Sequence, residues 1–365
     1  MQGGVAVIGG GTAGLILAKD LALNGIDVDV YEAHGEIGYG AEKASGILSI
    51  EGLSQLGINY KEAVVNTLYG ATIYGQREKM LIKAKRKMAY ILDRKKLAMI
   101  CAKEAEGAGA RINLNAKIGK ERLEQLRSEK IIVGADGPVS NVASFFSFPK
   151  MDSYILTYKA EFSGASIPDK ECVELFFSNI SKKFFGWTAP YSDSVLEVGI
   201  GEWMKTRRNS YSVFSEFLKT KTITEEVGNA SKRSGLASLI PFNVRKRTVK
   251  GNVILVGDSA GQVKSTTGGG IIFGGLCAKM AADVITQHIR FGRPLSDYEK
   301  LWRRKYGMDL GLHKILHSYY SRIGGRGMDL MIKFSKVFGI DSFLGEYGDM
   351  DRPSVVIKRL FIKWP

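Results

Sequence analysis

The stretch VAVIGGGTAGLILAKDLALNGIDVDVYE, residues 5–32, decides the fold of this chain. Its first four residues, Val5–Ile8, form an apolar run short enough for a buried parallel strand. Glycines follow in the spacing G-x-G-x-x-G, and Leu15–Leu23 is then predicted as a helix that an Asn-Gly pair ends. The alternation over Val28–Tyr31 predicts a second strand, so the stretch combines a strand, a helix and a strand.

Each glycine of this motif has its own role in dinucleotide binding. Gly9 permits the tight turn, Gly11 lets the backbone approach a pyrophosphate, and Gly14 lets the helix pack closely on the strand. The helix N-terminus offers free N–H groups and the positive end of its dipole to phosphates. Glu32 stands 18 residues beyond Gly14, where its carboxylate can accept hydrogen bonds from both ribose hydroxyls and disfavours a 2′-phosphate. The motif therefore predicts FAD or NAD rather than NADP.

Two more turns extend this pattern along the chain. GADG, residues 134–137, and GDSAG, residues 257–261, each end a predicted buried strand. Asp258 can bind a ribityl chain or lie near a pyrophosphate, and a glycine-rich turn opens the long helix Ile271–Ile289, whose dipole can face an isoalloxazine ring. A flavin is long enough to touch all three turns, so the sequence predicts FAD.

Length and composition predict a globular, cytoplasmic protein. The 365 residues are 45% hydrophobic and 10% aromatic, enough for two domains with a large core. Nothing resembles a signal peptide, and no run of 18 apolar residues predicts a membrane span. The three widely spaced cysteines Cys101, Cys172 and Cys277 argue for a reducing compartment and against a disulfide framework or a zinc site. We expect no metal.

The net charge of +15 indicates either a solvated basic surface or an anionic partner. Basic residues cluster in residues 77–87 and 245–250, but without the aromatic interleaving or helix-turn-helix pattern of a nucleic-acid binder. We expect no nucleic-acid partner; an acidic electron carrier and an anionic membrane face remain open. His313 and His317 are spaced i, i+4 without a third ligand, so a pair on the surface is expected.

The fold class predicted from these segments is α/β, or α+β. A Rossmann-like FAD-binding domain with a parallel sheet carries an inserted antiparallel-sheet substrate domain, because strands that alternate in pattern interrupt the β-α-β rhythm between about residues 141 and 240. A basic helical C-terminal region follows. The predicted boundaries are 1–65, 86–140 and 241–296 for the FAD-binding domain, 66–85 and 141–240 for the substrate domain, and 297–365 for the helical region.

A further helix is predicted to start within Tyr90–Arg94, with Asp93 as a plausible N-cap. Leu97, Cys101 and Ala105 recur on its apolar face. Cys101 is therefore interpreted as a core residue rather than a reactive thiol.

At these residues the sequence resembles the geranylgeranyl reductase family, a branch of the p-hydroxybenzoate-hydroxylase-like flavoproteins, over most of its length. GGGTAG (9–14) and GADGPVS (134–140) are shared across the wider flavoprotein group. More specific to the reductases are GDSAGQVKSTTGGGI (257–271), SGILSIEGL (45–53) and YGDMDRPS (347–354).

The most telling part of the resemblance is an aromatic motif followed by a glycine pair, formed by Phe185, Trp187, Pro190, Gly199 and Gly201. It is similar to the signature that marks the reductases within the wider group. The glycines leave room for a group to lie flat on the backbone, and a C20 isoprenoid chain requires an apolar, aromatic-lined channel. These five residues are therefore predicted to bind substrate.

The resemblance implies FAD-dependent reduction of isolated C=C bonds in geranylgeranyl chains of archaeal ether-lipid precursors or related polyprenyl compounds, by hydride transfer from N5 of the reduced flavin. The flavin contacts that it implies are Ala13, Glu32, Ala33, Ala44, Ser45, Gly46, Arg94, Ala116, Asp258, Gly270 and Ile271. For Arg94 an ordinary charged helix start stays open as an alternative.

One departure from the family concerns the proton. Many members carry a cysteine before their Gly-Leu/Ile-x-Ser motif, and that cysteine is suggested to act near the flavin. The aligned residue here is Ala44, and the neighbouring Ser45 is too weak an acid to replace a tuned thiol directly.

Two other readings of the same pattern stay open. One is a flavin monooxygenase that hydroxylates an aromatic or polyprenyl-quinone ring, and the other is a flavin-containing scaffold for nucleic acid. Since no second dinucleotide motif occurs, the reductant of a reductase would be transiently bound NAD(P)H or a ferredoxin-like protein.

The location that we expect is the cytoplasmic membrane face, because the lipid substrate comes from a membrane and no span is predicted. The predicted contact combines basic and apolar residues of the C-terminal region: Arg303, Arg304, Lys305, Lys358, Arg359, Phe361, Ile362, Lys363 and Trp364. We expect a monomer.

Overall fold

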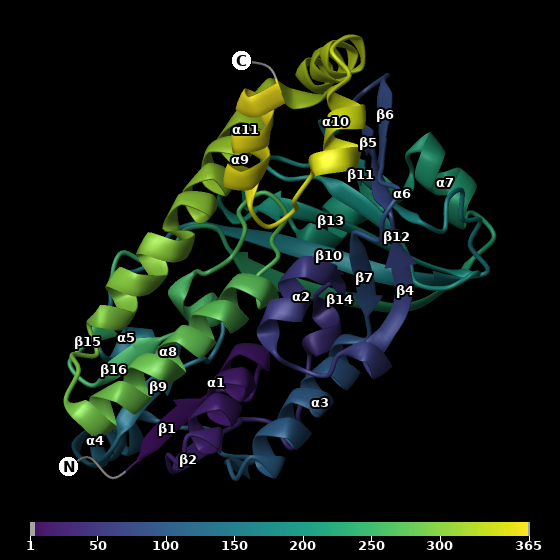
Figure 1. The fold of residues 1–365 in the computed structure, drawn as a ribbon. Helices are drawn as coiled ribbons and strands as arrows, with labels where there is room; N and C mark the ends of the chain where they lie inside the picture. The colour runs from purple at the N-terminus through teal and green to yellow at the C-terminus, as the bar shows by residue number, and fades with distance from the viewer. Residues whose placement is uncertain (1–3, 364–365) are drawn as a thin grey trace.

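The protein, seen here as a computed structural model that describes residues 4–363, contains a six-stranded, mainly parallel sheet at one end and a seven-stranded mixed sheet at the other (Figure 1). The six strands have the order β15-β16-β9-β1-β2-β8, and every neighbouring pair is parallel except β15 with β16. Their bounds are β1 Val5–Ile8, β2 Val28–Tyr31, β8 Arg111–Asn113, β9 Ile131–Gly134, β15 Val249–Lys250 and β16 Val253–Leu255.

Helices cover both faces of the parallel sheet because successive strand residues point to opposite sides. Val5 and Val7 pack in the core beneath α1, α3 and α8, whereas Ala6 and Ile8 pack against α4 and α5. The strands are therefore apolar on both faces, as is typical of parallel sheets. The bounds of these helices are α1 Thr12–Leu23, α3 Arg94–Gly107, α4 Lys120–Glu129, α5 Asn141–Phe145 and α8 Ile271–Phe291.

The mixed sheet has seven strands in the order β14-β10-β13-β12-β11-β5-β6. All neighbouring pairs are antiparallel except β5 with β11, which run parallel. The strands are β5 Gly70–Tyr74, β6 Lys79–Lys83, β10 Tyr154–Ser163, β11 Cys172–Phe176, β12 Gly186–Pro190, β13 Val195–Trp203 and β14 Ser231–Pro241. The mixed α/β fold class is confirmed, while the exact domain boundaries stay a prediction.

A three-stranded sheet, β3-β7-β4, joins the two larger sheets, and long helices complete the chain. Helix α9 runs along one side of the molecule to the far end, where α10 and α11 lie (Figure 1). Gly324, with φ of 61°, interrupts α9. The remaining bounds are β3 Ile47–Ser49, β4 Val64–Leu68, β7 Ala89–Leu92, α2 Ile50–Leu56, α6 Ser210–Leu218, α7 Lys221–Val227, α9 Asp297–Val337, α10 Ile340–Tyr347 and α11 Pro353–Lys363.

Two local predictions meet different outcomes. The Asp93 cap is confirmed, because its carboxylate accepts a hydrogen bond from the Lys96 N–H at 2.9 Å, but the preceding residues Ala89–Leu92 form a strand rather than the start of the helix. The expected surface pair of His313 and His317 is wrong, because both side chains are buried.

Within residues 4–363, no helix is long and apolar enough to cross a membrane.

The mixed sheet also encloses two neighbouring carboxyl groups, those of Glu174 and Glu226. Glu174 accepts hydrogen bonds from the Tyr74 hydroxyl at 2.7 Å and the Thr188 hydroxyl at 2.9 Å. Burial and the nearby Glu174 carboxyl raise the pKa of Glu226 to about 9. Glu226 is therefore a protonated acid at neutral pH.

We expect the free energy of unfolding to fall as pH rises from about 4.5 toward 9, since the folded state keeps a proton on Glu226 that the unfolded chain releases. Glu226→Gln should remove this loss and exceed the wild type by about 1–2 kcal/mol at pH 8, with little difference at pH 5. Urea unfolding of the variant and the wild type at pH 5 and pH 8 measures this difference in the free energy of unfolding. An equal difference at both pH values would contradict the raised pKa.

Candidate active site

The glycine motif forms the turn between β1 and α1 as its spacing predicts. Gly9 has a φ of 109°, in the region that favours glycine, and a Cβ there would overlap the Ala135 carbonyl oxygen. A Cβ at Gly14 would overlap the Gly9 carbonyl oxygen, whereas Gly11, the N-cap of α1, faces open space. This geometry leaves a phosphate free to approach the helix N-terminus at Gly11.

Glu32 lies at the carboxyl end of β2 and is held in place by the protein. Its Oε2 accepts a hydrogen bond from the Gly10 N–H at 2.8 Å, and its Oε1 accepts one from the His34 N–H at 3.0 Å. Ala116 donates its N–H to the Glu32 carbonyl oxygen at 2.8 Å, and the exposed Ala33 is next in the same loop. The predicted adenosine-side residues thus lie together beside the glycine turn.

The three predicted turns meet around the start of α8. A Cβ at Gly257 would lie 3.1 Å from the Ala13 Cβ, and a Cβ at Gly270 would lie 2.7 Å from the Asp258 Oδ1. Gly270 is the N-cap of α8, and Ile271 is its first residue. The turns after β1 and β16 therefore face each other across one end of the parallel sheet.

Arg94 supplies the observation that tests this site against a large anionic cofactor. Its Nε and Nη1 atoms are buried without a hydrogen-bond partner among the described residues, which is rare in native proteins unless a ligand supplies one. Burial lowers the pKa of Arg94 and raises that of Asp258 to about 6, and each charge opposes the other's shift. The unpartnered Arg94 donors suit an anionic group such as a phosphate, and the Asp258 carboxyl suits a hydroxyl donor, which favours Arg94 as a ligand over a plain helix start.

The segment Ala44–Gly46 connects this region to the mixed sheet. A Cβ at Gly46 would overlap the Leu92 carbonyl oxygen, so only glycine lets the segment lie against β7. Lys159 donates to the Ala44 carbonyl oxygen at 3.4 Å, and the Ser45 hydroxyl donates to the Glu197 carboxylate.

A buried ion pair that we did not predict lies at the centre of this connection. The Lys159 ammonium is 2.5 Å from the Glu197 Oε2, and the Glu197 side chain has no exposed surface. The Trp187 indole N–H donates to Glu197 Oε1 at 2.8 Å. Burial raises the pKa of the nearby Tyr191 hydroxyl, and the negative charge of Glu197 raises it further. The positive charge of Arg94 has a smaller effect in the opposite direction. The one sequence signal was a carboxylate inside the apolar pattern Val195–Ile200.

The aromatic motif forms a packed layer on the same sheet. The Trp187 ring lies where a Cβ at Gly199 would be, and the Phe184 ring lies where a Cβ at Gly201 would be. Phe185 stacks on Phe184 with ring centroids 4.4 Å apart. The glycines therefore accommodate the protein's own rings.

Pro190 lies apart from these rings, on β12, and its carbonyl oxygen accepts a hydrogen bond from Asn66 at 2.7 Å.

The two buried histidines of α9 form hydrogen bonds to other segments of the chain. His313 bonds to the Thr266 hydroxyl at 2.7 Å, and His317 bonds to the Lys183 carbonyl oxygen at 2.6 Å. Burial lowers the pKa of each to about 4. The described residues contain no group of three or more side chains placed to hold a metal ion.

Comparison with known proteins shows that residues 3–274 match the FAD binding domain family. The chain belongs to this family. FAD as the cofactor and the enzyme class, an FAD-dependent oxidoreductase, are thereby confirmed.

Several curated proteins similar to this chain are named digeranylgeranylglycerophospholipid reductase. Reductase 1 of Methanothermobacter thermautotrophicus is 29% identical and aligns over 91% of this chain and 92% of its own. The reductase of Methanocaldococcus jannaschii is 27% identical over 83% of this chain and 82% of its own. The resemblance to the geranylgeranyl reductase family is confirmed.

Solved structures show the same fold. A geranylgeranyl bacteriochlorophyll reductase-like protein of Thermoplasma acidophilum has a TM-score of 0.82 at 19% identity, covering 99% of this chain and 96% of that one. The flavin-dependent brominase Bmp2 has a TM-score of 0.73 at 13% identity, with 98% of both chains covered.

Proposed function

We propose that this protein reduces isolated C=C bonds of geranylgeranyl chains in archaeal ether-lipid precursors or related polyprenyl compounds. The observation that carries the proposal is the aromatic layer of Phe185 and Trp187, which Glu197 joins to Ser45 beside the cofactor region. The names of the reductase relatives support the same substrate class.

The chain's residues divide the work between binding and exclusion of water. When bound and reduced, FAD would supply the hydride that adds to one alkene carbon, while a proton from water would add to the other carbon. Arg94 and the α1 N-terminus would hold its phosphates, and Glu32 its ribose. The buried rings of Phe185 and Trp187 would keep the alkene in a dry, oriented position, which a poor hydride acceptor requires.

Mass spectrometry of prenyl lipids tests the proposal directly. Incubation of digeranylgeranyl lipid with dithionite-reduced holoprotein should give products heavier by two hydrogens for each saturated bond. A hydroxylated product formed with O₂ instead would establish a monooxygenase and overturn the proposal. The physiological reductant that we propose is an acidic ferredoxin-like protein, since the net charge of +15 suits association with an acidic protein surface.

A thiol at position 44 should change the proton supply. Ala44 is exposed and its carbonyl oxygen accepts a hydrogen bond from the Lys159 ammonium, so a cysteine there would lie near a cation, which lowers the pKa of a thiol toward neutral pH. We expect Ala44→Cys to add an inflection to the pH–rate profile between about pH 6 and 8, with unchanged FAD content. Ala44→Ser is the matched control and should keep the wild-type profile. If both variants behave like the wild type, position 44 does not face the reaction.

We further propose that α11 contacts the membrane at the cytoplasmic face. Phe361 and Ile362 are 71% and 79% exposed at its end, whereas Arg303 is engaged with Glu299 and the Arg245 carbonyl oxygen. Trp364 lies outside the described residues. Replacing Phe361 and Ile362 together by Ser should lower the fraction of protein that sediments with anionic vesicles, and unchanged sedimentation would remove α11 from the contact.

A further inference from the structure

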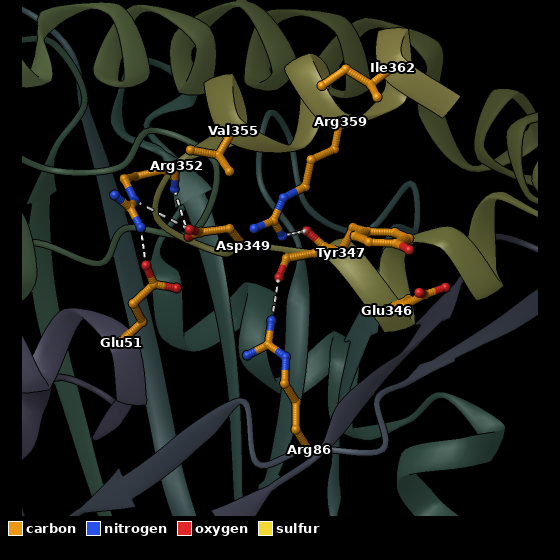
Figure 2. Close-up of a pocket in the computed structure, with 10 residues that line it drawn as sticks. Glu51, Arg86, Glu346, Tyr347, Asp349, Arg352, Val355, Arg359 and Ile362 are labelled. Carbon is orange, nitrogen blue, oxygen red and sulfur yellow. Dashed lines mark hydrogen bonds and ion pairs between the residues drawn. The ribbon is translucent and has the colours of Figure 1, made fainter. Parts of the chain in front are cut away.

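A half-open pocket lies between α2, the chain after β6, and the turn that joins α10 to α11 (Figure 2). Its volume is about 730 Å³. Three arginines and three acidic residues line it: Glu51, Arg86, Glu346, Asp349, Arg352 and Arg359. None of these side chains was assigned to the cofactor or to the isoprenoid chain.

The three arginines of the pocket differ in how their charge is compensated. Arg352 forms ion pairs with Glu51 and, at 3.3 Å, with Asp349. Arg86 and Arg359 make long hydrogen bonds, of 3.4 and 3.5 Å, to carbonyl oxygens of the 347–348 turn, and the Arg359 guanidinium also lies 5.8 Å from the centroid of the Tyr347 ring. Among the described residues, no carboxylate lies within ion-pair distance of either.

The guanidinium groups of Arg86 and Arg359 approach the 347–348 turn from opposite sides of the pocket (Figure 2). An anion bound beside this turn would be attracted by both positive charges. Guanidinium groups match the geometry of phosphate oxygens and bind them by paired hydrogen bonds. We propose that this pocket binds the phosphate of an anionic lipid headgroup through Arg86 and Arg359.

Apolar surface beside the pocket favours a lipid over free phosphate. Val355 and Ile362 line the pocket, and Ile362 and the adjacent Phe361 are largely exposed. Exposed large apolar side chains next to two arginines that lack a carboxylate partner in the part of the chain that the structure describes suit a ligand with an anionic head and a hydrocarbon tail.

The pocket is tied to the cofactor side of the molecule by the turn that lines it. Asp351 forms a buried ion pair with Lys264 at 2.6 Å and accepts a hydrogen bond from Ser49. Lys264 in turn donates its N–H to Gly269 at 3.1 Å, within the glycine-rich turn that precedes α8. A headgroup in the pocket would therefore contact the 349–352 turn, and Asp351 of this turn pairs with Lys264, which is bonded to the glycine-rich turn before α8. The identity of the bound lipid as substrate rests on the proposed function.

The test uses the full-length holoprotein and an Arg86→Gln/Arg359→Gln variant. The matched control is Arg122→Gln/Arg127→Gln on α4, at the opposite end of the molecule, which removes the same charge (Figure 1). Sedimentation with mixed phosphatidylcholine–phosphatidylglycerol vesicles should weaken roughly tenfold to thirtyfold in the pocket variant and far less in the control. FAD absorbance should be equal in all three proteins.

Each outcome decides between the sources of the anion. Equal loss in both variants, or no loss in either, would overturn the pocket as a headgroup site. Calorimetric binding of inorganic phosphate that requires both arginines, without an effect on vesicles, would establish a free-phosphate site and overturn the lipid proposal. Arginine-dependent vesicle binding by a protein that saturates no prenyl chain would leave the headgroup site standing and overturn only the proposed function.

Discussion

Lys159→Met should lower the free energy of unfolding by about 3–5 kcal/mol, because it leaves the buried carboxylate of Glu197 without its counter-charge. The loss should be large because both side chains are buried and Glu197 has no exposed surface through which water could reach it. Urea unfolding of the holoprotein, followed by circular dichroism at constant FAD concentration, measures the effect.

The double variant Lys159→Met/Glu197→Gln distinguishes the charge from the packing. The amide oxygen of Gln can still accept the Trp187 N–H, while no charge remains buried. We expect the double variant to recover most of the lost stability. If it is as unstable as Lys159→Met alone, the loss comes from packing of the Lys159 side chain and the ion pair contributes little.

Glu32→Ala should weaken FAD binding by roughly 1.5–3 kcal/mol, the range for hydrogen bonds to a charged group. Because Glu32 also holds the Gly10 N–H at 2.8 Å, its removal loosens the glycine turn as well as the ribose contact. Equilibrium dialysis of apoprotein against FAD gives the two dissociation constants.

Glu36→Ala is the control for Glu32→Ala, since Glu36 lies in the same loop and, within residues 4–363, pairs only with the exposed Lys95, at 2.8 Å. The control should bind FAD as the wild type does. Equal affinity in Glu32→Ala and the wild type would show that the ribose is held elsewhere.

The cofactor side of the fold could be predicted because its determinants are local. The strand, glycine turn and helix of residues 5–32 follow each other in sequence, and backbone sterics fix what Gly9 and Gly14 must do. The same holds for the Asp93 cap, which acts three residues from its own position.

The polar centre of the mixed sheet could not be predicted because it forms between distant strands. Lys159 lies on β10 and Glu197 on β13, and only the antiparallel pairing brings their side chains together. His313 and His317 fail as a prediction for a related reason: their spacing describes one helix face, whereas burial depends on what packs against that face.

The turn at residues 349–352 has a consequence for how the chain can be divided. The family match ends at residue 274, inside α8, yet Lys264 within that span has its buried counter-charge at Asp351, and Thr266 has its partner at His313. A fragment cut at the end of the match would split a helix, remove the counter-charge of Lys264, and strip the buried rings of Tyr298 and Trp302 from the core. We therefore expect the cofactor domain not to fold alone, and a truncation or domain exchange should carry α9 and the 349–352 turn with it.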